Sequence, residues 1–253
     1  MNLVYRVLGR YYRWANRRFA VRPIVYSGSQ AIVSFCFDEF PRSAYEAGVP
    51  ILEKYVIRGT FFTSMGFAGD ETGVNPKYML SVLRDLVSRG HEIGCHTYGH
   101  ELSQRVTSRT YEQSLDRNRE RASEVLGESP WQSFAYPAGS ITPSTKRMVA
   151  SRFRCGRGIS PGINRGTIDA NALLANSIYS LHYPLEHYLD LINEVVKDGG
   201  WLIFYTHDVD PNPGPYGCSP EYLDRIAAAA SGTKAMTLTI NEALDYISGT
   251  ETS

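Results

Sequence analysis

Three short stretches of the sequence carry side chains that could do chemistry together. His96 and His100 are four residues apart, a spacing that lets both imidazoles face one point in a helical turn or a tight loop. One apolar run ends in the adjacent acids Asp38 and Glu39, and a later apolar run ends at His207. Imidazole is the commonest protein ligand of catalytic divalent metals, although two histidines alone are as often a structural pair.

The adjacent acids strengthen the case for a metal. Two carboxylates at the end of a buried strand suffer desolvation and like-charge repulsion, which a bound cation or a proton-transfer role would offset. Together with the histidine pair and the later histidine, they predict a metal-assisted hydrolase.

Four motifs, in order along the chain, resemble those of the polysaccharide deacetylases of carbohydrate esterase family 4. That family carries an Asp-Asp pair after its first strand, a His-Ser/Thr-x-x-His motif, a Pro-containing turn and a late strand ending in histidine. The equivalents here are Asp38-Glu39, His96-Thr97-Tyr98-Gly99-His100, Phe134-Ala135-Tyr136-Pro137-Ala138-Gly139 and Trp201 to Asp208. The resemblance covers roughly residues 30–210, and four ordered motifs are far more specific than any one of them.

The resemblance implies a metal site formed by Glu39, His96 and His100. The ion would be divalent, with zinc expected first and cobalt, nickel or manganese as alternatives. Glu39 stands where the family normally has Asp, so a carboxylate is kept but its oxygens lie one bond length further out.

The resemblance also implies the catalytic groups. Asp38 matches the general base that deprotonates the attacking water, and His207 matches the acid that protonates the leaving amine. Ala138 matches the residue whose backbone N–H helps to hold the oxyanion, a donor that does not depend on the side chain. Asp208 either orients His207 or caps a turn, and Asp169 is the candidate for the family's aspartate that tunes the acid histidine.

Four residues are expected to contact substrate. Tyr136 and Pro137 belong to the turn motif, and Ile203 and Tyr205 share a face with the later histidine in an extended strand, where they would line a pocket for the acyl methyl.

Two family features are not at their usual places. The Asp-Trp segment that tunes the acid histidine has no clean counterpart, and the arginine that orients the catalytic aspartate has moved or is missing. Ala135 stands where the family often has an arginine that orients the catalytic aspartate. Arg154 or Arg157 could replace it from elsewhere in the chain.

Strands and helices alternate along the chain, which implies a parallel sheet covered by helices. The resemblance narrows this to an α/β fold, an irregular (β/α) barrel with about seven parallel strands. Chemistry in such barrels gathers at the carboxyl ends of strands, where the candidate residues stand.

We expect Ser43 to cap the first helix and 156–176 to be an ordered loop. Strands are expected at 31–37, 60–63, 133–136, 153–155, 178–179, 201–205 and 236–237 and just before residue 96, and helices at 44–57, 77–89, 110–127, 143–151, 184–198, 220–231 and 240–248.

Composition limits the partners and the compartment. The 253 residues hold 26 basic and 26 acidic side chains, a balance that argues against broad nucleic-acid binding. The four cysteines lack Cys-x-x-Cys spacing, and neither a secretory signal nor a membrane-length apolar stretch is evident. A reducing cytoplasm fits best. The histidines at 91, 182 and 187 are expected to be structural.

Residues 1–20 are expected to form a basic amphipathic helix that precedes a catalytic domain at 21–253. Arg6, Arg10, Arg13 and Arg17 fall on one narrow stripe, opposite an apolar and aromatic side. The helix either packs on the domain or lies peripherally on an anionic membrane surface. Packing is the simpler interpretation, because the segment is short and Arg18 interrupts the apolar side.

Three functions remain open from sequence. The first is a metal-dependent hydrolase that removes an acetyl or formyl group from an amino sugar, nucleotide- or lipid-linked, in surface-polysaccharide or O-antigen biosynthesis. The second is a catalytically silent relative that binds glycan with a degraded metal site. The third is a membrane scaffold.

Overall fold

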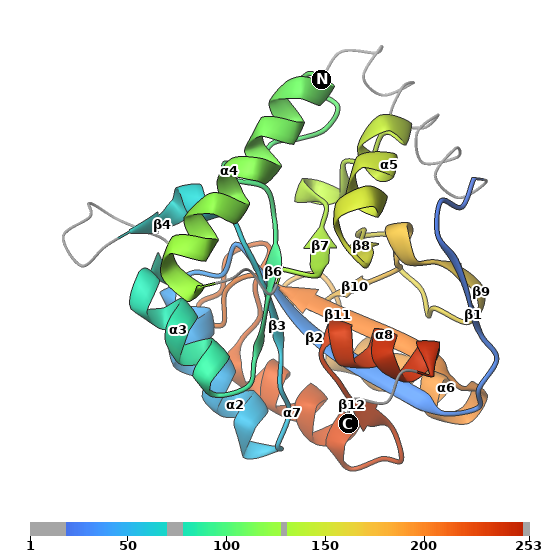
Figure 1. The fold of residues 1–253 in the computed structure, drawn as a ribbon. Coiled ribbons are helices and arrows are strands. Elements are labelled where there is room, and N and C mark those ends of the chain that lie inside the picture. The colour runs from blue at the N-terminus through green and yellow to red at the C-terminus, as the bar shows by residue number, and fades with distance from the viewer. Residues whose placement is uncertain (1–18, 70–77, 128–130, 250–253) are drawn as a thin grey trace.

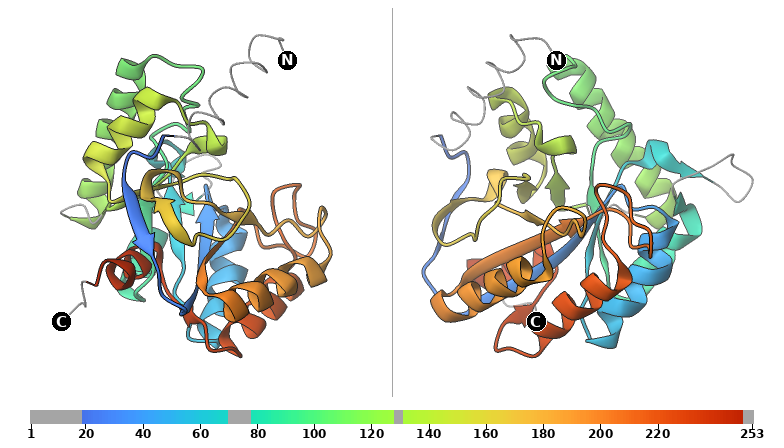
Figure 2. Two further views of the ribbon diagram at one scale, coloured as in Figure 1. Left: turned by 90° about the vertical axis from the view of Figure 1, so that its right-hand side faces the viewer. Right: turned by 180° about the vertical axis from the view of Figure 1, so that it is seen from behind.

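A computed structural model describes residues 19–69, 78–127 and 131–249. Its centre is a curled sheet of parallel strands with helices on the outside (Figures 1 and 2). The strands follow the spatial order β10 (Asn176–Ser177), β11 (Gly200–Thr206), β2 (Ala31–Asp38), β3 (Thr60–Thr63), β6 (Glu92–Cys95), β7 (Ser133–Ala135), β8 (Cys155–Arg157), with β12 (Met236–Thr237) paired to β2. Seven strands in one parallel path confirm the predicted irregular barrel.

The central strand explains why the sheet is covered on both faces. All eight residues of β2 are buried, as expected of a nearly continuous apolar run in a parallel sheet. Val33, Phe35 and Phe37 pack toward the helices, whereas Ile32 and Cys36 pack in the barrel interior. Because all pairings in this sheet are parallel, the carboxyl ends of the strands meet at one edge.

The helices pack around the outside of the sheet, and one of them lies over the amino ends of its strands. α8 (Ile240–Ser248) covers the amino ends of the strands, where the N–H of Asn241 donates to the Glu92 carboxylate (2.9 Å). The bounds are η1 (Ala44–Gly48), α2 (Val49–Lys54), α3 (Leu80–Ser88), α4 (Ser108–Leu126), α5 (Pro143–Arg152), α6 (Leu185–Asp198), α7 (Pro220–Ser231) and α8 (Ile240–Ser248). These agree closely with the predicted helices, except that the first is split.

Two local predictions were wrong. Ser43 does not cap the first helix, because its own φ and ψ (−61°, −35°) are already helical and its side chain makes no capping bond. The expected loop at 156–176 contains β9 (Gly166–Asp169) and η4 (Ala170–Ala172). The strands that flank it, β8 and β10, lie two residues from their predicted positions and reach into this range. β9 pairs antiparallel with β1 (Pro23–Tyr26), and so distant a pairing leaves no periodic pattern within either short strand.

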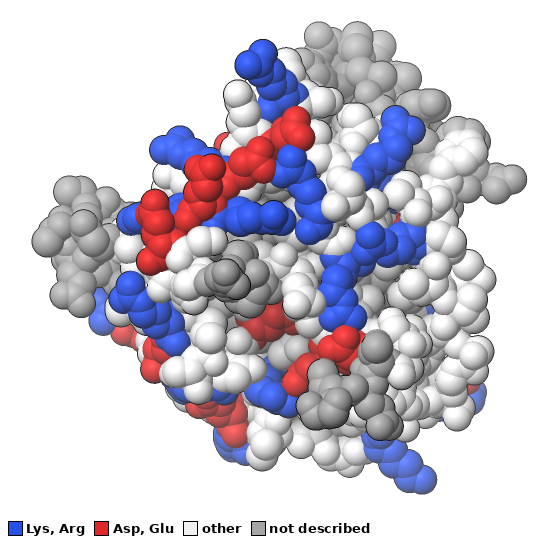
Figure 3. Space-filling view, in the orientation of Figure 1, with Lys and Arg blue, Asp and Glu red and all other residues white. Residues whose placement is uncertain are grey.

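The surface carries both signs of charge. Figure 3 shows acidic and basic side chains interleaved over α4 and its neighbours, in line with the balanced composition. Along the described residues, no helix combines the length and apolar character needed to cross a membrane. The predicted helix at 1–20 falls almost wholly outside the described range, so it stays a prediction.

Candidate metal centre and active site

The two acids stand at the carboxyl end of β2. Asp38 is the last residue of the strand and is 3% exposed. Glu39 follows with φ 44°, and its N–H donates to the carbonyl of Phe62 on the next strand (3.1 Å). A non-glycine residue in this left-handed region is strained, and such strain concentrates at functional sites. The turn therefore holds both acids at the edge where the strands end.

The histidine pair lies on the loop that follows β6. The N–H of His96 donates to the Thr63 carbonyl (3.1 Å), which ties the start of the loop to β3. His100 has φ 60°, and the Glu101 carboxylate accepts the N–H of Gly99 (3.1 and 3.2 Å to its two oxygens). The four-residue spacing thus acts through a tight loop, one of the two geometries that the sequence allowed.

Glu39, His96 and His100 converge on one point. Their donor atoms all lie within 4.8 Å of one another. Glu39 Oε1 lies 2.6 Å from His100 Nε2 and 4.0 Å from His96 Nε2. The longer side chain of Glu39 therefore still brings an oxygen into the histidine pair.

The state of His96 suits a metal ligand. Its Nδ1–H donates to the Ala135 carbonyl (2.8 Å), which leaves the Nε2 lone pair facing the cluster. Burial lowers the pKa of His96 to about 4, against the raising effect of the Asp38 charge, so the ring is neutral at pH 7. Neutral imidazoles are the ligand form, and two of them with a glutamate match a donor set found in catalytic zinc sites. The residues present therefore fit a divalent ion.

Arg157, the last residue of β8, holds Asp38 from inside the barrel. Its fully buried guanidinium donates through Nη2 to Asp38 Oδ1 and through Nη1 to the Gly158 carbonyl (3.1 Å). It also lies over the rings of Phe62 and Tyr205, 5.0 and 4.8 Å from their centroids. Charge, hydrogen bonding and packing together fix the orientation of the Asp38 carboxylate.

Of the two arginines considered from sequence, Arg157 is the one that reaches the site. Arg154 pairs instead with Asp245 near the surface (2.6 Å). In the register of β7 and β8, Arg157 stands opposite Ala135, the position where the resemblance expects arginine. The guanidinium is thus supplied from the neighbouring strand at the same height in the barrel.

Arg157 also sets the charge state of Asp38. Burial alone would raise the pKa of this carboxyl, but the charge of the Arg157 guanidinium, together with its hydrogen bond, outweighs burial and holds the pKa below its usual range. Asp38 is therefore ionised at neutral pH, the state in which a carboxylate can accept a proton.

We expect Arg157→Met to lower the free energy of unfolding by about 3–5 kcal/mol, because it leaves a buried carboxylate unpaired. In the wild type, the pair stabilises the fold at neutral pH, and this contribution is lost as the pH falls through the lowered pKa of Asp38. In the variant, desolvation of the unpaired carboxyl raises the pKa of Asp38. The loss of kcat/KM on acidification should therefore begin at a higher pH than in the wild type. Urea unfolding and a pH–rate profile measure both effects.

Arg154→Met is the matched control, because it removes an arginine from a partly exposed ion pair three residues away. It should change stability by about 1 kcal/mol or less and leave the pH profile unchanged. Equal effects of the two substitutions would contradict the assigned role of Arg157.

His207 follows β11 and is held by the loop beyond it. Its Nδ1–H donates to the Tyr216 carbonyl (3.1 Å), and its backbone N–H donates to the same oxygen (3.2 Å). The Asp208 carboxylate accepts the N–H of Gly214 (2.8 Å). Asp208 therefore caps the loop, and the Tyr216 carbonyl orients the histidine and leaves its Nε2 available.

Asp169 does not serve His207, so that prediction was wrong. Its carboxylate pairs with the buried Lys146 (2.6 Å) and accepts the N–H groups of Val21 and Arg22 (3.1 and 3.0 Å). It anchors the segment before β1 instead.

The turn after β7 has one exposed residue at its centre. Residues Pro137–Gly139 form a short 3-10 turn, in which Ala138 is exposed and has φ 48° and ψ 26°. This is another strained non-glycine position at the edge where the strands end.

Three of the four expected substrate contacts are corrected, because these residues are buried. Tyr136 is fully buried in the layer between sheet and helices, and its hydroxyl donates to the Asn171 carbonyl (3.1 Å). Ile203 is fully buried inside the barrel, one strand layer below Tyr205, which is 6% exposed. Side chains alternate along a strand, so only the residues nearest its end reach the opening. Pro137 is also buried, with its exposed neighbour Ala138 at the turn.

Comparison with known proteins gives this arrangement a family. The polysaccharide deacetylase family model matches residues 26–153, about half of the chain. The chain belongs to the polysaccharide deacetylase family. Members of that family are carbohydrate esterases that act on acetyl amide or ester bonds. The uncharacterised protein YlxY of Bacillus subtilis is 30% identical over 108 residues, which are 42% of this chain and only 31% of that protein's length.

Solved structures share the fold of this polysaccharide deacetylase domain. A family 4 acetyl xylan esterase from Clostridium thermocellum, in complex with cobalt, aligns with a TM-score of 0.62 at 23% identity, over 87% of this chain and 93% of that one. A peptidoglycan deacetylase from Bacillus subtilis gives 0.58 at 16% identity, over 87% and 92%. A family 4 pseudoenzyme from Bacillus anthracis gives 0.61 at 15% identity, over 85% and 66%. The fold therefore spans active and inactive proteins, and activity must be argued from the site.

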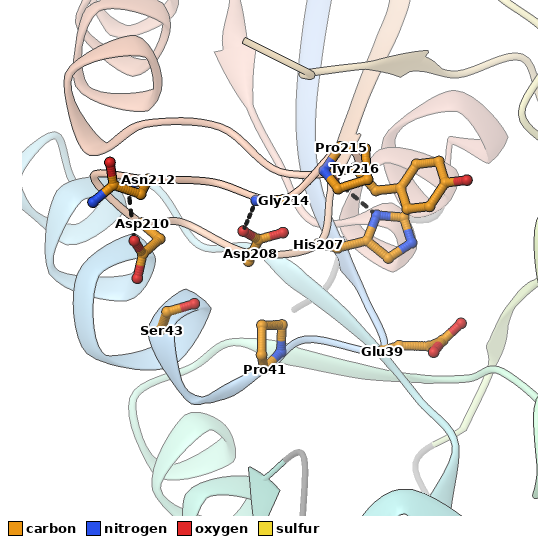
Figure 4. A pocket seen from close by; sticks show the side chains of 10 residues that line it. All are labelled: Glu39, Pro41, Ser43, His207, Asp208, Asp210, Asn212, Gly214, Pro215 and Tyr216. Carbon is orange, nitrogen blue, oxygen red and sulfur yellow. Dashed lines mark hydrogen bonds between the residues drawn. The ribbon is translucent and has the colours of Figure 1, made fainter. Parts of the chain in front are cut away.

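A cavity of about 490 Å³ opens beside the candidate metal site (Figure 4). Glu39, His207 and Tyr216 lie together at one end of it, and Ser43, Asp210 and Asn212 lie at the other. Its full lining is Glu39, Pro41, Ser43, His207, Asp208, Asp210, Asn212, Gly214, Pro215 and Tyr216. The loop after β11 thus both orients the histidine and forms a wall of the cavity.

Arg157 could have been identified from its place at the end of a strand, but the predicted boundary of that strand was wrong. A strand expected at 153–155 leaves Arg157 beyond its end, whereas the observed β8 ends on Arg157 itself. With the correct boundary, this residue would have joined the other candidates at strand ends. Tyr216 acts through its carbonyl, so its residue type carried no signal.

Proposed function

We propose that the protein is a metal-dependent hydrolase that removes an N-acyl group, acetyl or formyl, from an amino sugar. The proposal rests on one observation: Glu39, His96 and His100 converge at the edge of the sheet where Asp38 and His207 also stand. Membership of the polysaccharide deacetylase family supports hydrolytic deacetylation of a carbohydrate. The convergence of the three side chains supports a bound metal ion.

Each residue has a defined part in this reaction. Asp38, ionised and held by its arginine, takes a proton from the water that attacks the acyl carbon. The N–H of Ala138 stabilises the negative charge that develops on the acyl oxygen. As the C–N bond breaks, His207 gives a proton to the departing nitrogen, and the products are an amine and a carboxylic acid. A divalent ion held by Glu39, His96 and His100, with zinc as our first choice, would supply Lewis acidity to the acyl oxygen and water.

The test is hydrolysis by protein of defined metal content. The chain is stripped by chelation, dialysed and reloaded with zinc, cobalt, nickel or manganese in turn. We expect release of acetate or formate from N-acyl amino sugars only after reloading, at one ion per chain. Turnover that is the same with and without metal would refute the proposal.

A silent glycan-binding relative is the second candidate. The pseudoenzyme with the same fold, and glutamate in place of the family's usual aspartate at position 39, motivate it. Glycan binding without acid release from the zinc-loaded protein would favour this candidate over the hydrolase.

We further propose a cytoplasmic location and a role in surface-polysaccharide or O-antigen assembly, with residues 1–20 in peripheral contact with an anionic membrane. The four cysteines are all buried and free, as expected in a reducing compartment. The basic stripe in the N-terminal sequence motivates the membrane contact. Flotation with anionic vesicles, with and without residues 1–20, tests it, and equal flotation of both proteins would remove it.

A further inference from the structure

The loop that carries the two candidate metal-binding histidines passes twice through a disfavoured backbone conformation. Thr97 has φ 61° and His100 has φ 60°, although neither is glycine. A residue with a Cβ stays in this left-handed region only where its surroundings hold it there. Residues 96–100 belong to no helix or strand, so groups outside the regular structure must hold them.

Side-chain oxygens accept three backbone N–H groups of this loop. Ser114 Oγ, on α4, accepts the N–H of Tyr98 (2.8 Å). The two oxygens of the Glu101 carboxylate accept the N–H of Gly99 (3.2 and 3.1 Å). Thr97 Oγ1 accepts the N–H of Glu101 (3.0 Å). The loop therefore relies on side chains for bonds that a helix or a strand makes with its backbone.

Glu101 joins these bonds into one network. Its carboxylate also accepts the hydroxyl of Ser114, whose oxygen in turn accepts the N–H of Tyr98. Hydrogen bonds to a carboxylate are charge-assisted and roughly twice as strong as neutral ones. A Cβ on Gly99 would lie 2.8 Å from Glu101 Oε1, so the carboxylate packs directly against the turn. Glu101 thus links α4 to the turn that precedes His100.

The two histidines are held in different ways. His96 is fixed by β3 and β7, which accept its backbone N–H and its ring Nδ1–H. His100 follows the turn that Glu101 holds, and its Nε2 lies 2.6 Å from Glu39 Oε1. Loss of the Glu101 contacts should therefore shift His100 relative to the other two donors.

We propose that Glu101 is a positioning residue of the candidate metal site, which holds the loop so that the His100 imidazole meets Glu39. Glu101 is not itself one of the three converging donors, and Ser114 acts through it. The proposal rests on the proposed function, because it takes the three donors to hold a divalent ion. The charge of Glu101 then sets the affinity for that ion, although Glu101 is not a ligand.

Glu101→Gln in the full chain is the first test. Glutamine keeps the shape of the side chain, but it loses the charge and replaces one oxygen with an NH2 group that cannot accept a hydrogen bond. The zinc Kd, measured by competition with a chelator, should weaken by about tenfold or more, the usual effect of removing a group that orients a metal ligand. The visible absorption of the cobalt-loaded variant should also differ from that of the wild type, because it reports coordination geometry.

Ser114→Ala tests the same network from α4. It removes the hydroxyl that donates to Glu101 and the acceptor of the Tyr98 N–H. The zinc Kd should weaken in the same direction. In the double variant, the combined weakening should be less than the product of the two single effects, because both residues act through one network.

Glu242→Gln is the matched control. The Glu242 carboxylate accepts the N–H of Thr239 (2.9 Å) in the capping box of α8 and pairs with Arg58 (2.7 Å), at the opposite edge of the sheet. This substitution should lower the midpoint of urea unfolding, as Glu101→Gln does, but leave the zinc Kd and the cobalt spectrum at their wild-type values. A general loss of stability is thereby separated from a change at the metal site.

A zinc Kd and a cobalt spectrum that match the wild type in Glu101→Gln would overturn the assignment of Glu101. Ser114→Ala decides in the same way if the first variant does not fold. Changes in zinc Kd of equal size in Glu101→Gln and in the control would also overturn it.

The same measurements separate this proposal from the proposed function. If the zinc-loaded wild type releases no acid from N-acyl amino sugars, the hydrolase proposal fails, and the role of Glu101 is judged by metal binding alone. If the wild type takes up neither zinc nor cobalt, the metal-dependent function and the role of Glu101 fail together.

Discussion

Replacing His100 with alanine should reduce bound zinc to well below one ion per chain and lower acyl release by about 10³-fold. The imidazole supplies one of three converging donors, and its Nε2 lies 2.6 Å from the Glu39 carboxylate. The fall in rate follows because the electrostatic contribution of a catalytic metal is worth several kcal/mol, about tenfold in rate for each 1.4 kcal/mol. Metal analysis after dialysis and a single-substrate rate measurement give the two values.

His187→Ala serves as the control for this substitution. His187 lies on α6 and stacks on Tyr183, 4.7 Å between ring centroids, so the same deletion there should leave the bound zinc at the wild-type level. Zinc that stays at one ion per chain in the His100 variant would show that this side chain is no ligand.

Replacing Asp38 with asparagine should lower acyl release by about 10²–10⁴-fold while the protein still binds one metal ion per chain. The amide cannot accept the proton of the attacking water, yet it nearly matches the carboxylate in shape, and Asp38 is not among the three converging donors. Rate and metal stoichiometry measured on the same preparation separate loss of the base from loss of the site.

Asp224→Asn makes the same change in a surface carboxylate that pairs with Lys54 (2.7 Å). Its rate should match the wild type. A rate for the Asp38 variant that also matches the wild type would mean that another group accepts the proton.

The two substitutions test different parts of the site. His100 belongs to the cluster that would hold the ion, and Asp38 belongs to the buried pair with Arg157. If the protein has kept the fold but lost catalysis, as the pseudoenzyme with this fold has, the His100 substitution should still lower the bound metal. Neither substitution would then change the rate of acyl release.

Much of the fold could be predicted from the periodicity of apolar residues and from the turn residues between elements. β2, β3, β11 and most helices fell where apolar runs and helical patterns placed them. The region 156–176 was missed because its strands are two to four residues long, too short to show a period, and because β9 pairs with β1, more than a hundred residues earlier.

The sequence predicted which residues belong to the site better than it predicted the contacts between them. Strand ends and residue types identified the carboxylates and histidines, and those of the candidate metal cluster converge. Ile203 was placed at the substrate because alternation identifies a face of the strand but not the depth along that face, and Tyr136 was placed there because it belongs to the turn motif.

By itself, the sequence determined which reactive groups exist, their order, and the strands that bring them to one edge, because alternation and spacing are local properties of the chain. The tertiary structure alone decided that Arg157 holds Asp38, that a backbone carbonyl orients His207, and that a loop wall faces Ser43 across a cavity. These contacts join segments far apart in the sequence. They depend on strand order and register, which set distances that local patterns do not contain.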